Sequence, residues 1–273
     1  MQERVKTAKP GDAILLEERR GAVAILTLNR PEARNSLSLA LLRALGAAVE
    51  RLTGDPDIRA VVIAANGPAF SAGHDLKELA AHRADEDSGL AFYKTAMETC
   101  SGMMQAILRS PKPFIAAVQG TATAAGCQLV ATCDLAVAAE GAKFATPGVN
   151  IGLFCSTPMV ALSRNMPRKR ALEMLLLGDM LSAEDAAEHG LVNRVVAQDR
   201  VFDEAFSMAS TVAAKSSLTV AIGKEAFYRQ LEMPTAEAYS YAADVMVRNM
   251  MARDAAEGIG AFLEKRTPEW KGC

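Results

Sequence analysis

Residues 114–128 read FIAAVQGTATAAGCQ, and this stretch decides the fold. Phe114–Val118 is a continuous apolar run, which is typical of a strand buried on both faces of a sheet. Gly120 ends the run, and the small residues after it open a helix that reaches Cys133. N–H groups at a helix start are unpaired and lie at the positive end of the dipole, so they suit an anion or an oxyanion. Taken alone, the loop is better explained by close packing of small residues.

A second loop of the same kind comes earlier in the chain. Ala60–Ala65 is another apolar run, and it is followed by Ala69-Phe-Ser-Ala-Gly-His-Asp-Leu-Lys77. Small residues let a ligand approach the backbone closely, although a tight turn explains this loop equally well on its own. Both loops follow parallel-type strands, where the ligand sites of α/β folds gather. Together they predict two N–H groups aimed at one ligand oxygen, an oxyanion hole.

Strand and helix patterns alternate through the rest of residues 1–201, which predicts an α/β core with parallel strands. Ser38 is the expected N-cap of the first helix. The other expected strands are Ile14–Glu18, Ala22–Asn29 and Leu135–Ala138, and the expected helices are 38–52 and 90–109.

Residues 202–273 form a second region in which every pattern is helical. The expected helices are Val201–Ala214, Ser217–Gln230, Thr235–Met251 and Ala255–Lys265. Apolar residues lie on more than one side of the third helix, at Met246, Val247, Met250 and Met251. Burial against another subunit and burial in an intrachain core both explain them.

Composition excludes several classes of protein. A net charge of −2 with dispersed Lys and Arg argues against nucleic acid or an anionic membrane as the main partner. No apolar run approaches the ~20 residues of a membrane span. The N-terminal stretch MQERVKTAKPGD has no apolar h-region, so it is not a secretory signal. A cytoplasmic protein is expected, or one of the mitochondrial matrix in a eukaryote.

The cysteines and histidines indicate neither disulfides nor a metal site. The five cysteines have no CxxC pairing and lie mostly in apolar runs, so reduced, buried thiols are expected. The three histidines lack metal-ligand spacing, so no zinc or iron site is expected.

Several motifs resemble the crotonase (enoyl-CoA hydratase/isomerase) superfamily, colinearly from about residue 13 to residue 267. The motifs are Leu28-Asn-Arg-Pro-Glu-Ala-Arg-Asn35, Phe70-Ser-Ala-Gly-His-Asp-Leu-Lys77, Ala125-Gly-Cys-Gln-Leu with Cys133-Asp134, Lys143-Phe-Ala-Thr-Pro147, and Glu257-Gly with Phe262-Leu-Glu-Lys-Arg266. The resemblance implies a spiral of β-β-α units with a helical C-terminal oligomerisation region that forms trimers or hexamers. It also implies acyl-CoA metabolism, with a coenzyme A thioester as substrate or ligand and no permanently bound cofactor.

The resemblance also assigns roles to individual residues. It places the two backbone donors on His74 and Ala125, and the imidazole of His74 need not take part. Expected contacts with coenzyme A are Ala72, Asp75, Leu76, Lys77, Phe262 and Lys265.

The acid and base of the family are missing. Hydration of an enoyl thioester needs both around one water, and the family's two glutamate positions fall on Gln128 and Gly148. A glutamine cannot take up a proton near neutral pH. A third position, an aspartate in some isomerases, falls on Ser156, and residues 141–158 contain no carboxylate. Ordinary hydratase activity is therefore not expected.

Two functions remain open, and whether the chain is an enzyme is open with them. The first is an acyl-CoA enzyme of another kind, such as a decarboxylase, isomerase or hydrolase. The second is a non-catalytic protein that binds acyl-CoA and regulates through it. A serine hydrolase and a Rossmann dehydrogenase are disfavoured, because Ser71 lies outside any G-x-S-x-G and no G-x-G-x-x-G follows a strand. The depth of the acyl pocket is expected to depend on the polar stretch 79–95.

Overall fold

A β-hairpin opens the described part of the chain, residues 13–273 of a computed structural model. β1 (Leu15–Arg20) and β2 (Val23–Leu28) pair antiparallel, with Arg20 opposite Val23. Gly21 has φ +60° in the turn, a conformation that costs glycine little. The strands expected at 14–18 and 22–29 are confirmed, and β1 extends two residues further, through Arg19 and Arg20. The expectation that residues 1–12 carry no signal lies outside the described residues.

The hairpin forms one edge of a six-stranded sheet with the order β1-β2-β3-β5-β7-β10. Every pairing from β2 onward is parallel, and β5 is buried along its whole length. This confirms the predicted α/β class, because strands covered on both faces read as continuous apolar runs. The remaining strands are β3 (Ala60–Ala65), β5 (Phe114–Val118), β7 (Leu135–Ala139) and β10 (Arg194–Val196).

A second sheet of four short strands was not predicted. Its order is β4-β6-β8-β9, and β4 and β6 lie within the two segments that had been interpreted as loops. Strands of two or three residues are too short to show an alternating pattern, so sequence periodicity cannot reveal them. β4, β6 and β8 each follow a strand of the large sheet, which gives the expected spiral of β-β-α units. The strands are β4 (Ala69–Ser71), β6 (Thr121–Thr123), β8 (Lys143–Ala145) and β9 (Leu181–Ser182).

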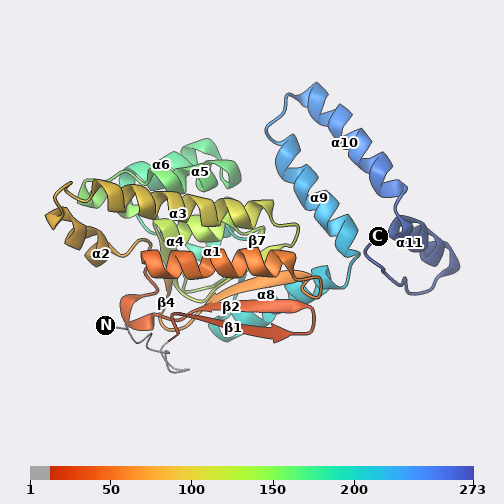
Figure 1. Cartoon of the computed structure of the whole chain (residues 1–273), viewed down its shortest axis with the longest axis horizontal. Helices are drawn as coiled ribbons and strands as arrows, with labels where there is room; N and C mark the ends of the chain where they lie inside the picture. Colours follow the sequence, from red (N-terminus) through yellow and green to blue (C-terminus); the bar gives the residue numbers. More distant parts are fainter. Residues whose placement is uncertain (1–12) are drawn as a thin grey trace, which may run out of the picture.

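Helices cover the large sheet (Figure 1). α1 (Leu39–Gly54) and α3 (Leu90–Arg109) pack against each other, and the Ser38 hydroxyl caps α1 by accepting from the Leu41 N–H at 3.3 Å. α8 (Val201–Ala213) packs on β3, β5 and β7. The shorter helices are η1 (Pro31–Ala33), α2 (Leu76–Ala81), η2 (His82–Ala84), α4 (Ala125–Thr132), η3 (Pro147–Ile151), α5 (Ser156–Asn165), α6 (Arg168–Leu177), α7 (Ala183–Glu188) and η4 (Gln198–Arg200).

The three helices after α8 extend away from the sheets (Figure 1). Packing therefore places α8 with the core, although the chain pattern had grouped it with the tail. Met246, Val247, Met250 and Met251 are each at least 58% exposed, so an intrachain core is the wrong explanation for them. The three helices are α9 (Ser217–Gln230), α10 (Thr235–Met250) and α11 (Arg253–Glu264).

A buried ion pair joins α9 to the core. Lys224 Nζ lies 2.7 Å from Asp134 Oδ2 and donates to the carbonyl oxygens of Ile107 and Lys112, each at 2.9 Å. The Tyr228 hydroxyl donates to Asp134 Oδ1 at 2.9 Å, and the Phe114 N–H donates to Oδ2 at 2.7 Å. The carboxylate thus links the start of β5 to α9 through fully satisfied polar contacts.

Replacement of Lys224 by methionine should destabilise the protein strongly. The variant leaves the Asp134 carboxylate buried without its cation, and breaking such a pair costs about 3–5 kcal/mol. Urea denaturation of Lys224→Met measures this loss in the free energy of unfolding. Lys94→Met is the control, because the exposed Lys94–Glu98 pair at 3.9 Å should contribute less than about 1 kcal/mol. Equal stability of both variants would contradict the assignment.

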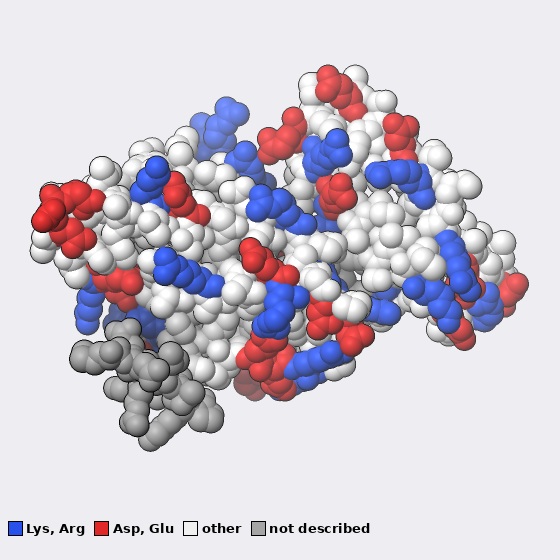
Figure 2. Space-filling view, in the orientation of Figure 1, with Lys and Arg blue, Asp and Glu red and all other residues white. Residues whose placement is uncertain are grey.

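The visible surface mixes both signs of charge, as Figure 2 shows for one face. Within residues 13–273 no single helix is long and apolar enough to cross a membrane. One pair, Gln198–Ala213 with Ser217–Gln230, passes the same test together but is bent by 107°.

Candidate functional site

A cavity of about 780 Å³ lies where the two glycine-bearing loops meet α2, α3 and α5. Its walls are mainly apolar, and their few polar side chains include His74, Arg83 and Ser156. This combination is typical of small-molecule sites. The full lining is Ala72, His74, Leu76, Leu79, Ala80, Arg83, Tyr93, Met97, Ala124, Ala125, Pro147, Gly148, Asn150, Ile151, Leu153, Phe154, Cys155, Ser156, Thr157 and Pro158.

Two glycines bring the loops into backbone contact. A Cβ on Gly73 would lie 2.8 Å from the Ala124 Cβ and 3.1 Å from the Ala125 nitrogen. A Cβ on Gly126 would lie only 2.3 Å from the Ser71 carbonyl oxygen. No larger residue fits at either position, so the first loop is held directly against the start of α4.

His74 and Ala125 lie beside these contacts and line the cavity. Within residues 13–273, neither the His74 N–H nor the Ala125 N–H donates a hydrogen bond to a protein acceptor. Ala124 directly precedes Ala125 at the start of α4. Its φ is 49°, a conformation that costs a non-glycine residue about 1–3 kcal/mol. The Ala124 N–H donates to the Ala145 carbonyl at 2.9 Å, which helps to hold this strained turn. Two residues of the cavity wall, on loops in backbone contact, thus have N–H groups without a protein acceptor among the described residues.

The His74 imidazole is largely enclosed, and its Nε2 has no partner among the described residues. Burial lowers the pKa of His74, while the Leu37 backbone and the Glu78 carboxylate oppose this shift. The ring is therefore neutral near pH 7.

No aspartate or glutamate lines the cavity within the described residues. Gln128 lies on the buried α4, and its Oε1 has no partner in residues 13–273. Gly148 and Ser156 both line the cavity, but Ser156 Oγ only donates to the Phe154 carbonyl at 3.3 Å. The site thus lacks a carboxylate that can exchange a proton with a ligand.

Cys155 fills the space where a side chain at position 148 would start. A Cβ on Gly148 would lie 2.9 Å from Cys155 Sγ and 2.7 Å from the Leu153 carbonyl oxygen. Burial raises the pKa of Cys155, and a hydrogen bond from the Gly148 backbone opposes the shift. The local packing is therefore built around glycine, and any larger residue there requires the Leu153–Cys155 segment to shift.

Of the other residues expected to contact coenzyme A, some line the cavity and others lie outside it. Ala72 and Leu76 line the cavity, whereas Lys77 is exposed outside it. The Asp75 carboxylate is already occupied: it caps α2, accepts from the Ser36 hydroxyl at 3.0 Å and pairs with Arg30 at 3.1 Å.

Phe262 and Lys265 are not brought to the cavity. They lie at the end of α11, and Figure 1 places α11 at the opposite end of the molecule from α2. Within one chain they therefore cannot contact the same ligand as His74.

Sequence reasoning missed several lining residues. Cys155, Leu153 and Phe154 follow the expected glutamate position, but nothing in their pattern indicates a site. Arg83 and Tyr93 come from the stretch 79–95, which was expected to set the pocket depth.

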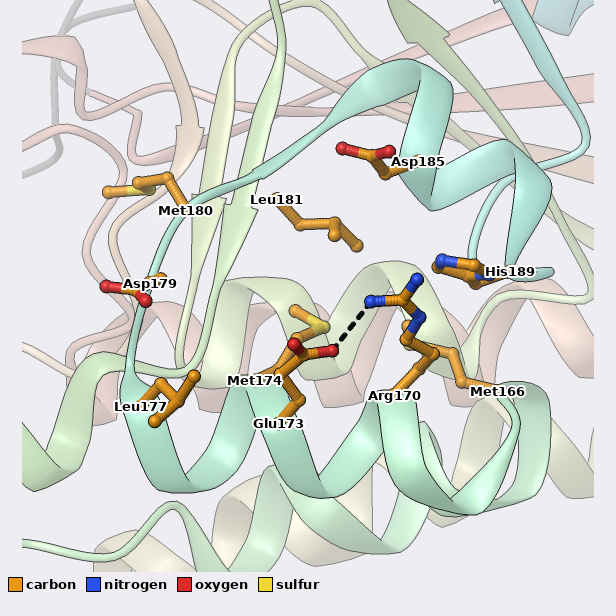
Figure 3. A pocket seen from close by; sticks show the side chains of 10 residues that line it. All are labelled: Met166, Arg170, Glu173, Met174, Leu177, Asp179, Met180, Leu181, Asp185 and His189. Atoms are coloured by element: carbon orange, nitrogen blue, oxygen red, sulfur yellow. Dashed lines mark hydrogen bonds and ion pairs between the residues drawn. The ribbon is translucent and has the colours of Figure 1, made fainter.

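A smaller cavity of about 200 Å³ lies between α6 and α7 (Figure 3). Several of its polar groups pair with each other or with neighbours: Arg170 pairs with Glu173 at 2.8 Å, and Asp185 accepts from the Ser182 hydroxyl at 2.7 Å. No group of three or more His, Cys, Asp or Glu residues suited to a metal occurs in residues 13–273.

The family model described as enoyl-CoA hydratase/isomerase matches residues 18–273. The chain belongs to this family. It is 46% identical over 90% of its length to rat enoyl-CoA hydratase domain-containing protein 3, mitochondrial, and covers 80% of that protein. It is 36% identical to a probable enoyl-CoA hydratase of Rhizobium meliloti, with 94% and 97% of the two chains aligned. The resemblance to the crotonase superfamily is thus confirmed.

Solved structures of the family have the same fold. An enoyl-CoA hydratase of Mycobacterium smegmatis superposes with a TM-score of 0.90 at 53% identity, over 95% of this chain and 99% of that one. Human enoyl-CoA hydratase domain-containing protein 3 also gives 0.90, at 44% identity over 94% of this chain and 100% of that one. These likenesses confirm the crotonase fold.

Replacement of Gly148 by alanine should lower the free energy of unfolding by about 1–3 kcal/mol, because the new methyl group overpacks the wall. Gly141→Ala is the matched control, since a Cβ there meets nothing within 4 Å. Urea denaturation of both variants tests this, and an unaffected Gly148→Ala protein would show that the loop yields freely.

Acidification should destabilise the protein partly through His74. Its folded pKa is lowered, so below the ordinary histidine pKa of about 6.5 the unfolded chain binds the proton more tightly. Stability is then lost as pH falls, with a slope of at most about 1.4 kcal/mol per unit from this group. His74→Gln should lose less stability than the native chain between pH 7.5 and 5.5. The same loss in both would assign the pH dependence to other groups.

Proposed function

We propose that this chain binds an acyl-CoA thioester in the large cavity, with the thioester oxygen between the N–H groups of His74 and Ala125. The observation that carries the proposal is the pair of unpaired donors held together by the Gly73 and Gly126 contacts. The apolar walls suit an acyl chain, and the family supplies the thioester class. Neighbouring N–H groups at a helix start favour negative charge on that oxygen.

The chemistry best suited to this site forms an enolate without a carboxylate base. In decarboxylation of a malonyl-type thioester, the bond to the carboxyl carbon breaks and its electron pair moves to the thioester oxygen. Carbon dioxide leaves, and the α-carbon later takes a proton. Two N–H donors stabilise the enolate oxygen, and removing one such donor typically costs ~10²–10³ in rate. Isomerisation and hydrolysis are less favoured, because no carboxylate among residues 13–273 lines the cavity to move a proton or activate water.

A second candidate function is binding without turnover. A cavity lining free of carboxylates in the described part of the chain supports it equally, since a regulator that senses acyl-CoA needs affinity alone. Turnover of malonyl-CoA or methylmalonyl-CoA by the purified protein distinguishes the two: a rate above the uncatalysed reaction supports the decarboxylase, and none supports the regulator.

Calorimetry with butyryl-CoA and its thioether analogue S-butyl-CoA tests the oxygen contact directly. The analogue lacks only the carbonyl oxygen. Two hydrogen bonds of about 0.5–1.5 kcal/mol each should make butyryl-CoA bind roughly 5–150-fold more tightly. Equal affinities would show that the two N–H groups do not contact the thioester oxygen. No binding of either ligand would overturn the proposal.

Hydration of crotonyl-CoA should be very slow. Loss of a general acid or base costs ~10²–10⁴ in rate, so loss of both should leave at most ~10⁻⁴ of ordinary hydratase activity. Absorbance loss of the enoyl thioester measures this rate, with an active hydratase as the positive control. A rate within tenfold of that control would show that another group performs the proton transfers.

The exposed apolar side chains of α10 and α11 support self-association as a trimer or hexamer. Phe262 and Lys265, distant from the cavity of their own chain, would then approach the nucleotide end of a ligand held by a neighbouring subunit. The rat relative is mitochondrial by name. This supports the mitochondrial matrix for a eukaryotic source.

A further inference from the structure

Arg83 is the one side chain of fixed charge that lines the large cavity within the described residues. It projects from η2, between α2 and α3. The cavity that it lines is formed mainly by apolar side chains, among them Leu79, Met97 and Phe154. A guanidinium is always protonated in proteins and needs an anion or water as a partner. An entirely apolar acyl chain offers it neither.

The acids next to Arg83 in the sequence are occupied elsewhere. Asp85 Oδ2 lies 2.7 Å from His82 Nδ1. The Asp87 carboxylate accepts from the N–H groups of Gly89 at 2.9 Å and Ala91 at 2.8 Å. No ion pair of Arg83 occurs within residues 13–273. The guanidinium is therefore available to a ligand.

The turn that carries Arg83 is held from both sides. The His82 ring stacks on Phe92 with centroids 3.6 Å apart, which fixes η2 against α3. The Tyr93 hydroxyl donates to the Leu79 carbonyl at 3.1 Å, which ties α3 to the end of α2. A charged group on such a supported turn suits recognition, because its backbone need not be ordered when a ligand binds.

We propose that Arg83 binds a second carboxylate, carried on the acyl chain itself, so that the ligand is the coenzyme A thioester of a dicarboxylic acid. This inference rests on the proposed acyl-CoA site and narrows its substrate class. The methylene groups would lie along the apolar walls while the guanidinium donates two hydrogen bonds to the carboxylate oxygens, the bidentate geometry that arginine favours.

The surface charge is compatible with a carboxylate that arrives on the acyl chain. Figure 2 shows acidic side chains gathered at the end of the molecule where α2 lies, and they would repel free anions. A carboxylate tethered to a bound thioester is delivered from within the cavity instead. Arg83 itself is exposed, so water weakens the contact and a moderate preference is expected.

Matched ligand pairs test the proposal. Calorimetry would compare succinyl-CoA with butyryl-CoA, glutaryl-CoA with pentanoyl-CoA and adipyl-CoA with hexanoyl-CoA. At the chain length that reaches Arg83, the native protein should bind the dicarboxylic ligand about tenfold more tightly than Arg83→Met binds it. Arg83→Met should lose that preference and bind the monocarboxylic ligands unchanged, and Arg83→Lys should retain part of it.

Lys94→Met is the matched control. It removes one positive charge from the exposed surface of α3 without touching the cavity, so the preference should persist. Three results would overturn the inference: no pair with a preference that Arg83→Met abolishes, an equal loss for both members of each pair, or the same loss in Lys94→Met. The second result would assign Arg83 to coenzyme A. Binding of monocarboxylic ligands alone would leave the proposed acyl-CoA site intact, whereas binding of none would overturn that site.

Discussion

The contact between two backbones at Gly73 and Gly126 is the constraint on which the site depends. It joins a loop that leaves the second strand of one β-β-α unit to the helix that begins in the next unit. The repeat brings equivalent loops to the same edge, and the absence of two Cβ atoms lets them close. Beside this contact, α2, α3, η3 and α5 supply most of the remaining lining of the cavity. A strained Ala124 indicates that the arrangement is held by its surroundings.

The same cavity separates what the backbone supplies from what side chains supply. N–H donors belong to the backbone, so they do not depend on the identity of the side chains around them. Proton transfer needs titratable side chains, and no Asp or Glu lines the cavity within residues 13–273. At Gly148, Cys155 Sγ and the Leu153 carbonyl occupy the space that a side chain would enter. The wall is therefore packed around glycine at this position.

Long apolar runs made most of the fold predictable. The runs Phe114–Val118 and Ala60–Ala65 predict buried parallel strands. Apolar residues at helical spacing predict α1 and α3. The second sheet escaped because its strands have only two or three residues, whose pairing depends on neighbours far along the chain. Both loops were expected to form the site, because glycine and small residues mark close backbone approach. Arg83 and Cys155 could not be predicted as lining residues. Arg83 lies in η2 and Cys155 follows η3, and the path of these short segments is not specified by sequence periodicity.

The link between Asp134 and Lys224 has a consequence for synthesis on the ribosome. The two residues are 90 positions apart, so β7 emerges long before the cation that neutralises the carboxylate at its start. A nascent chain that stops short of α9 has a charge to bury and no partner for it. The large sheet therefore cannot reach its final stability as an early, separate folding unit. Neutralisation of this buried carboxylate therefore waits for a helix that lies outside the core.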